Sequence, residues 1–96
     1  MQLTITRTDL ARIIDHCLTG YPHEACGILG GRDGRVLKVY MMTNARPGPV
    51  SYEMDPEEQF RAMKDIREAG FGLVGIFHSH PSGPAYPSSV DVEKAY

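Results

Sequence analysis

Three residues in the last quarter of the sequence have the types and spacing of a metal site. His78 and His80 are separated by one residue, and Asp91 follows eleven residues after His80. Side chains two apart on a strand point to the same face, so we expect both imidazoles side by side and Ser79 facing the other way. Three prolines stiffen the loop that returns Asp91 as the third ligand. Two histidines and one carboxylate leave one position of a tetrahedral zinc ion (Zn²⁺) open to water, as in catalytic sites.

Such a site needs a proton acceptor, and Glu24 is the acid best placed in the sequence. Zinc lowers the pKa of bound water from about 15.7 toward about 7, and a nearby carboxylate then takes and passes on the proton. Glu24 lies where a loop enters the glycine-rich stretch 25–31. Considered without the histidines, Glu24 would be an ordinary surface acid.

Ser88 and Asp91 have a second interpretation, as the start of a helix. Ser-x-x-Asp resembles a helix N-terminal box, with Ser88 as the cap and the charge of Asp91 favouring the helix dipole. The two interpretations are compatible, because a capped first turn is a rigid mount for a metal ligand. We therefore expect a helix to begin at Ser88.

The remaining histidines and the cysteines are not expected to take part in the chemistry. His16 lies in a helical stretch away from the apolar stripe, where a solvated side chain is expected, and His23 would point away from Glu24. Cys17 and Cys26 have the pattern of small apolar core residues, so we expect free thiols and no disulfide.

Length and composition narrow the class of protein. The 96 residues form a single predicted domain, 1–96. The net charge is -2 and no basic block occurs, so nucleic acid is not an expected partner. No apolar run approaches the ~18 to 20 residues that cross a bilayer, so no membrane partner is expected either. Two cysteines without an export signal indicate a cytoplasmic protein.

The predicted strands form one sheet. Alternating residues at 3–6 predict a short first strand, and 25–44 predict a hairpin with Asp33-Gly34 as its turn. The apolar stretch 71–80 predicts a buried strand that carries the two histidines at its end. With the helices between them, these strands predict an α/β fold, a mixed β-sheet packed with helices.

Two helices are predicted. The first is capped by Thr8 and ends at Gly20, and the second is capped by Asp55, begins at Pro56 and ends at Gly70. Apolar spacing predicts their buried faces. For the first helix these residues are Leu10, Ile13, Ile14, Cys17 and Leu18, and for the second Phe60, Met63 and Ile66.

The complete motif resembles that of the JAMM (MPN-plus) zinc metalloproteases, compact prokaryotic type. It reads H-x-H, seven residues, S, two residues, D, with an upstream Glu, and the stretches EACGILGG, YEMDPEEQF and GLVGIFHSHP are also similar to this family. The resemblance implies a curved JAB/MPN sheet, cytidine-deaminase-like. It also implies roles for the five motif residues: zinc ligands His78, His80 and Asp91, the general acid/base Glu24, and Ser88 steadying the oxyanion.

The resemblance implies a deubiquitinase-like isopeptidase. Its substrate would be an isopeptide or peptide bond after the C-terminal Gly-Gly tail of a ubiquitin-like or sulfur-carrier protein. Such a tail could add as a strand beside the glycine-rich stretch, as an edge strand allows. Family domains continue past the motif, so we expect 1–96 to be truncated at its C-terminus, or a second chain, as in a homodimer, to complete the sheet edge.

Two other functions stay open. The chain could be a non-catalytic MPN-type interaction module or an inactive fragment, although scaffold members usually lack some ligands and this sequence lacks none. A zinc hydrolase of small molecules or nucleobases would share the water chemistry, but the His/Cys/Cys set with P-C-x-x-C that deaminases use is absent.

Overall fold

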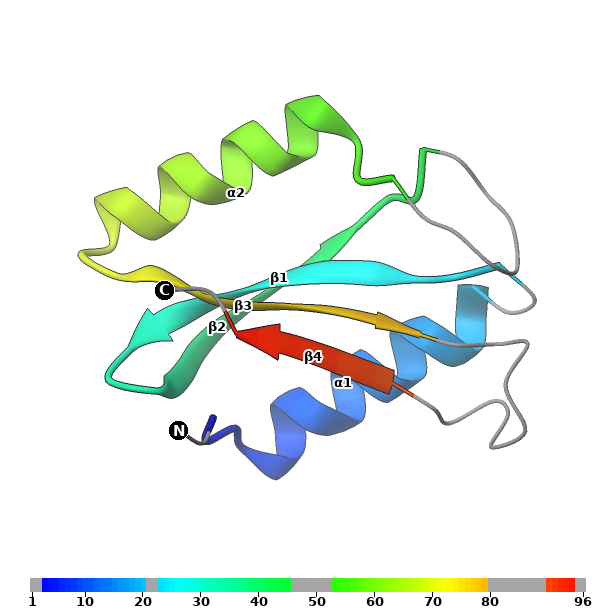
Figure 1. The fold of residues 1–96 in the computed structure, drawn as a ribbon, viewed down its shortest axis with the longest axis horizontal. Helices are drawn as coiled ribbons and strands as arrows, with labels where there is room; N and C mark the ends of the chain where they lie inside the picture. Colours follow the sequence, from blue (N-terminus) through cyan, green and yellow to red (C-terminus); the bar gives the residue numbers. More distant parts are fainter. Residues whose placement is uncertain (1–2, 21–22, 46–52, 80–89, 95–96) are drawn as a thin grey trace.

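A four-stranded sheet lies between two helices. The computed structural model describes residues 3–20, 23–45, 53–79 and 90–94. The elements are α1 (Arg7–Gly20), β1 (Cys26–Arg32), β2 (Arg35–Met42), α2 (Pro56–Glu68), β3 (Gly72–Ser79) and β4 (Val90–Lys94). The strand order is β2-β1-β3-β4 with antiparallel pairings, and α1 and α2 cover opposite faces (Figure 1). The predicted α/β class is confirmed. Neither helix is long and apolar enough to cross a membrane within these ranges.

The β1–β2 hairpin forms as predicted. Asp33 and Gly34 both have positive φ, 54° and 72°, which is the conformation that a two-residue type I′ turn requires. The pairing shifts between Gly30 and Gly31, where β2 carries an additional residue. A Cβ on Gly31 would lie 1.8 Å from the carbonyl oxygen of Arg35, so this bulge accepts only glycine.

The glycine-rich strand β1 lies inside the sheet. It pairs with β2 on one side and β3 on the other, so its backbone groups are used along both edges. The expectation that a substrate tail adds beside this strand is therefore wrong. Within the described residues the outer strands of the sheet are β2 and β4.

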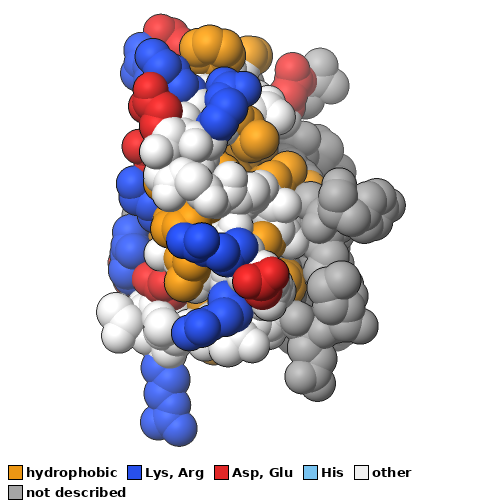
Figure 2. All heavy atoms as spheres, turned by 90° about the vertical axis from the view of Figure 1, so that its left-hand side faces the viewer, with side chains coloured by type: hydrophobic (Ala, Val, Ile, Leu, Met, Phe, Trp, Pro, Cys, Tyr) orange, Lys and Arg blue, Asp and Glu red, His pale blue; other side chains and the backbone are white. Residues whose placement is uncertain are grey.

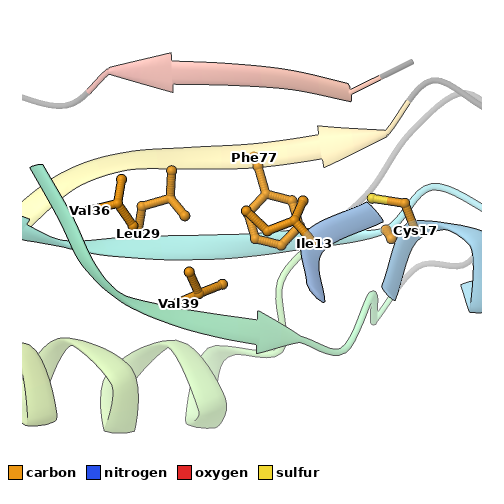
Figure 3. Packing of buried hydrophobic residues seen from close by; sticks show 7 residues of the cluster. Ile13, Cys17, Leu29, Val36, Val39 and Phe77 are labelled. Carbon is orange, nitrogen blue, oxygen red and sulfur yellow. The ribbon is translucent and has the colours of Figure 1, made fainter. Parts of the chain in front are cut away.

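The helix α1 packs against the sheet through a narrow row of two buried residues. Ile13 and Cys17 are buried, while Leu10 and Leu18 are 44% and 45% exposed, so the predicted buried face is too wide. Ile13 and Cys17 are one turn apart and meet the sheet. Figure 3 shows Phe77 and Ile13 pointing toward one another. The core on this side consists of Ile13, Cys17, Ala25, Leu29, Val36, Val39 and Phe77.

The chain enters α1 earlier than predicted. Thr6 Oγ1 accepts a hydrogen bond from the backbone N–H of Asp9 at 3.1 Å, so Thr6 and not Thr8 caps the helix. Because the helix begins at Arg7, the predicted first strand is reduced to one isolated parallel bridge between Thr4 and Arg35.

The helix α2 has the predicted limits. The Asp55 carboxylate accepts hydrogen bonds from the backbone N–H groups of Glu57 and Glu58, at 2.9 and 3.0 Å, and Pro56 follows the cap. Gly70 comes after the last turn with φ 78°, as helix-terminating glycines do.

The buried face of α2 differs from the prediction at one residue. Ala62 and Ile66 are buried and Met63 is partly buried, but Phe60 is 67% exposed. Phe60 lies about 200° around the helix from Ala62, so the two cannot share a face. Beneath α2 the sheet contributes Cys26, Ile28 and Met42 to the core.

The last described element is a strand and not a helix. Val90–Lys94 pairs antiparallel with β3, with Ser79 opposite Val90. Strand pairing satisfies the backbone groups of this short segment, whereas an isolated helix of similar length would be marginal, and β-branched Val90 and Val92 favour the strand. The predicted helix is therefore wrong over 90–94, while its cap, Ser88, lies outside the described residues.

Candidate active site

Glu24 is a buried acid at one end of the sheet. It precedes the first residue of β1 and is only 6% exposed. The alternative of an ordinary surface acid is therefore wrong. Burial of a carboxylate costs free energy unless polar groups surround it, so this position calls for a partner.

The partner is His78, which approaches from β3. His78 is the second-last residue of this strand, faces the α2 side next to Cys26 and is 8% exposed. Its Nδ1 lies 3.6 Å from Glu24 Oε1, a distance longer than a hydrogen bond. The fold thus brings together two predicted site residues that are far apart in the sequence.

The structure describes less of the other three predicted site residues. Asp91 is the Cα partner of His78 in the β3–β4 pairing, but only its backbone is described. His80 and Ser88 lie outside the described residues. Among the residues whose side chains are described, no group of three or more His, Cys, Asp or Glu forms a metal site. The zinc site therefore stays a prediction, with the backbones of His78 and Asp91 side by side.

The described residues have donor chemistry that fits zinc. Imidazole nitrogens and carboxylate oxygens are its usual ligands besides thiolate. The buried imidazole of His78 lies at a strand end, and the carboxylate of Glu24 lies 3.6 Å from its Nδ1. This pair suits a ligand next to a proton acceptor.

Two residues that the sequence did not single out for a role hold the backbone at Glu24. The Asn44 side-chain amide donates a hydrogen bond to the Glu24 carbonyl oxygen at 2.9 Å. Ser79 Oγ accepts one from the Ala25 N–H at 2.9 Å, and the Ser79 N–H donates to the Ala25 carbonyl oxygen at 3.0 Å. Ser79 faces away from His78, as predicted. This orientation was the one sequence signal that Ser79 contacts the face of the sheet opposite the histidine.

A small pocket opens beside Glu24. Its volume is about 250 Å³, below the ~300 to 1,000 Å³ of typical ligand pockets, so it suits a small group. The residues that line it are His16, Gly20, His23, Glu24, Ala25, Met42, Thr43 and Asn44.

His16 differs from its prediction. It is partly buried, with Nε2 3.3 Å from the carbonyl oxygen of Cys26 and its ring edge-on to Phe77, 6.2 Å between centroids. The expected solvated side chain is wrong, because α1 lies across the start of β1 and leaves this side chain against the sheet. His23 is exposed and lines the pocket.

The cysteines are buried free thiols, as predicted. Burial, together with the negative charges of Glu58 and Glu24, raises the pKa of Cys26 to about 11. Burial also raises the pKa of Cys17, against a smaller opposing effect of its hydrogen bond with Ser79. Both thiols stay protonated at neutral pH, so neither is a nucleophile.

Comparison with known proteins identifies the family. Residues 6–96 match the family described as prokaryotic homologs of the JAB domain. The chain is 46% identical over 70 residues to a desampylase of Pyrococcus furiosus, covering 73% of this chain and 50% of the relative. It is 37% identical over 94 residues to the CysO-cysteine peptidase of Mycobacterium tuberculosis, covering 95% and 64%.

A solved structure gives the same result. The solution structure of a protein from Desulfitobacterium hafniense superimposes with a TM-score of 0.77 at 41% identity, covering 91% of this chain and 62% of that one. The chain thus spans between half and just under two thirds of the length of these three relatives. Sequence and fold together place the chain in the prokaryotic JAB (JAMM) family.

Proposed function

We propose that the protein is a zinc-dependent peptidase that cleaves after the C-terminal Gly-Gly tail of a ubiquitin-like or sulfur-carrier protein. The observation that carries the proposal is the buried Glu24 carboxylate 3.6 Å from His78 Nδ1 at the end of β3. The names of two relatives, a desampylase and a CysO-cysteine peptidase, support hydrolysis of a bond to a protein.

The motif residues would share the work. His78, His80 and Asp91 would hold the zinc ion, which when bound supplies a Lewis acid and makes water reactive at neutral pH. Ser88 would donate a hydrogen bond to the developing oxyanion, an interaction worth roughly 3 to 4 kcal/mol in other hydrolases.

Glu24 would carry the proton. Its carboxylate accepts a proton from the attacking water and delivers it to the nitrogen of the leaving amine as the C–N bond breaks. The low exposure of Glu24 suits this role, because a site that excludes bulk water keeps the transferred proton on the reaction path.

The pocket supports a substrate without side chains at the cleaved end. A volume of about 250 Å³ beside Glu24 suits the narrow backbone of a Gly-Gly tail. A cytoplasmic location is part of the proposal, supported by the two free thiols, which persist in a reducing compartment. A homodimer stays a prediction.

A cleavage assay tests the proposal. Purified protein is incubated with a ubiquitin-like protein joined through its Gly-Gly tail to a lysine or to a peptide, before and after treatment with a chelator. We expect cleavage after the second glycine, loss of cleavage on chelation and recovery with zinc. A scaffold protein would bind the conjugate and leave it intact, and that result together with no zinc binding would overturn the proposal.

A further inference from the structure

The peptide bond that follows Glu24 is held by side chains at both of its polar atoms. Asn44 donates to its carbonyl oxygen and Ser79 Oγ accepts from its N–H, which belongs to Ala25, each at 2.9 Å. This peptide precedes β1, whose ladder begins at Cys26, so strand pairing alone does not fix it. The side chains of Asn44, which follows β2, and Ser79, the last residue of β3, supply the hydrogen bonds that strand pairing does not provide here.

Ser79 is itself firmly placed. It is 2% exposed, and its N–H donates to the Ala25 carbonyl oxygen. Because neighbouring side chains on a strand alternate, the end of β3 presents His78 to one face and Ser79 to the other. One strand end thus places both the imidazole beside Glu24 and one support of the Glu24 backbone.

Asn44 is anchored from the opposite side. Its Oδ1 accepts a hydrogen bond from the Glu53 N–H at 2.9 Å, which orients the amide so that its nitrogen faces Glu24. The neighbouring Thr43 donates through its N–H and its hydroxyl to the Glu58 carboxylate, at 2.6 and 2.8 Å. The end of β2 is therefore fixed to the first turn of α2.

We propose that Asn44 and Ser79 are positioning residues that fix the plane of the Glu24–Ala25 peptide and so aim the Glu24 carboxylate. This inference rests on the proposed function, in which Glu24 transfers the proton. Loss of either hydrogen bond lets the backbone at Glu24 shift, which moves its Cα and Cβ, and a misplacement of about 1 Å at a catalytic group can lower a rate about 100-fold.

Four variants test the inference in the purified protein. Ser79→Ala and Asn44→Ala each remove one support, and we expect kcat to fall about 10- to 100-fold with KM and zinc content little changed. Ser79→Thr keeps the hydroxyl and should retain most of the activity. Asn44→Asp keeps the acceptor for Glu53 but loses the donor, so it should be as slow as Asn44→Ala.

A second measurement does not depend on activity. Hydrogen exchange of the Ala25 amide, followed by NMR, should become faster in Ser79→Ala than in the wild type by more than the change in global stability explains. Val39→Ala is the matched control, since Val39 is 8% exposed in the same core and pairs with Leu29, away from the start of β1. It should lower stability and leave both kcat and the relative protection of Ala25 unchanged.

The outcomes separate the two proposals. If Glu24→Gln removes turnover while Ser79→Ala and Asn44→Asp keep wild-type kcat, the positioning role is wrong and the proposed function stands. If Glu24→Gln is as active as the wild type, the proposed function is wrong. If Ser79→Ala does not fold, Asn44→Asp, at a partly buried position, decides the question by the same kcat measurement.

Discussion

The two ends of the sheet are built in different ways. At the turn end, Asp33 and Gly34 join β1 to β2 through their own backbone conformation. At the other end, the peptide after Glu24 is held by Asn44 and Ser79, whose hydrogen bonds join residues 20 and 54 apart in the sequence. The turn end is specified by neighbours in the chain, and the site end only by the completed fold.

The two ends of the sheet also differ in where their charged and polar side chains lie. Figure 2 shows the turn end, where Lys and Arg side chains are interspersed with acidic and apolar ones. At the site end an acid, a histidine and a serine are buried together. Charge that lies in solvent costs little, whereas buried polar groups must be matched by partners, so the site end is more sensitive to substitution.

The largest loss of stability is expected beneath the site end. Phe77 is 0% exposed and packs against Ile13, so Phe77→Ala should lower the free energy of unfolding by about 3 to 5 kcal/mol. Urea denaturation measures the change. Phe60→Ala is the control, because Phe60 is 67% exposed and should change stability by less than about 0.5 kcal/mol. Equal losses in the two variants would contradict the assignment of the core.

The second-largest loss of stability is expected at alkaline pH, through the buried Cys26 thiol at the site end. The pKa of Cys26 is about 11 in the folded protein against 9.0 for an ordinary thiol, so the folded state holds this proton more tightly. The stability from this group is complete below pH 9 and is lost as the pH rises toward 11. A pKa difference of about two units between the folded and unfolded states corresponds to roughly 2 to 3 kcal/mol in the free energy of unfolding.

Urea denaturation between pH 7 and pH 11 checks this effect. The pKa values of Tyr40 and Lys38 are also raised, so the wild type is compared with Cys26→Ala to isolate the contribution of the thiol. The variant should lose less stability than the wild type above pH 9. Parallel curves would show that the Cys26 thiol does not contribute.

At the turn end the sensitive position is a glycine. A Cβ at Gly31 would lie 1.8 Å from the Arg35 carbonyl oxygen, so Gly31→Ala must shift the backbone and should cost roughly 1 to 3 kcal/mol. Gly72→Ala is the matched control, since its Cβ would come no nearer than 4.0 Å to the Gly31 carbonyl oxygen. The bulge assignment fails if thermal unfolding shows Gly31→Ala to be as stable as the control.

The smallest effect is expected at the start of α2. Asp55→Ala removes the acceptor for two backbone N–H groups and should cost about 1 kcal/mol. Glu57→Ala, on the exposed first turn, is the comparison and should cost less. A loss in Glu57→Ala that matches the loss in Asp55→Ala would rule out Asp55 as the main cap.

The sequence predicted what depends on local chemistry. The Asp33-Gly34 turn, the Asp55 cap and the helix end at Gly70 are each determined by a few adjacent residues, and the structure contains all three. The opposite orientation of Ser79 and His78 followed from strand alternation alone.

What depends on neighbours distant in the sequence could not be predicted. Apolar spacing alone does not show how wide a row the sheet covers, so Leu10 and Phe60 were assigned to the core but are exposed. The candidate site was predicted from its motif, while the hydrogen bond from Asn44 to the Glu24 carbonyl oxygen is visible only in the folded chain. The strand at 90–94 needs β3 as a partner, which a local helix signal cannot reveal.

The central claim is that His78 binds zinc beside Glu24. The most direct test follows the histidine ring nitrogens by NMR while zinc is added to the metal-free protein. The account predicts that the signals of His78 and His80 shift and saturate at one zinc per chain, while those of His16 and His23 stay in place. A titration that leaves His78 unchanged, or that shifts His16 and His23 instead, would contradict it.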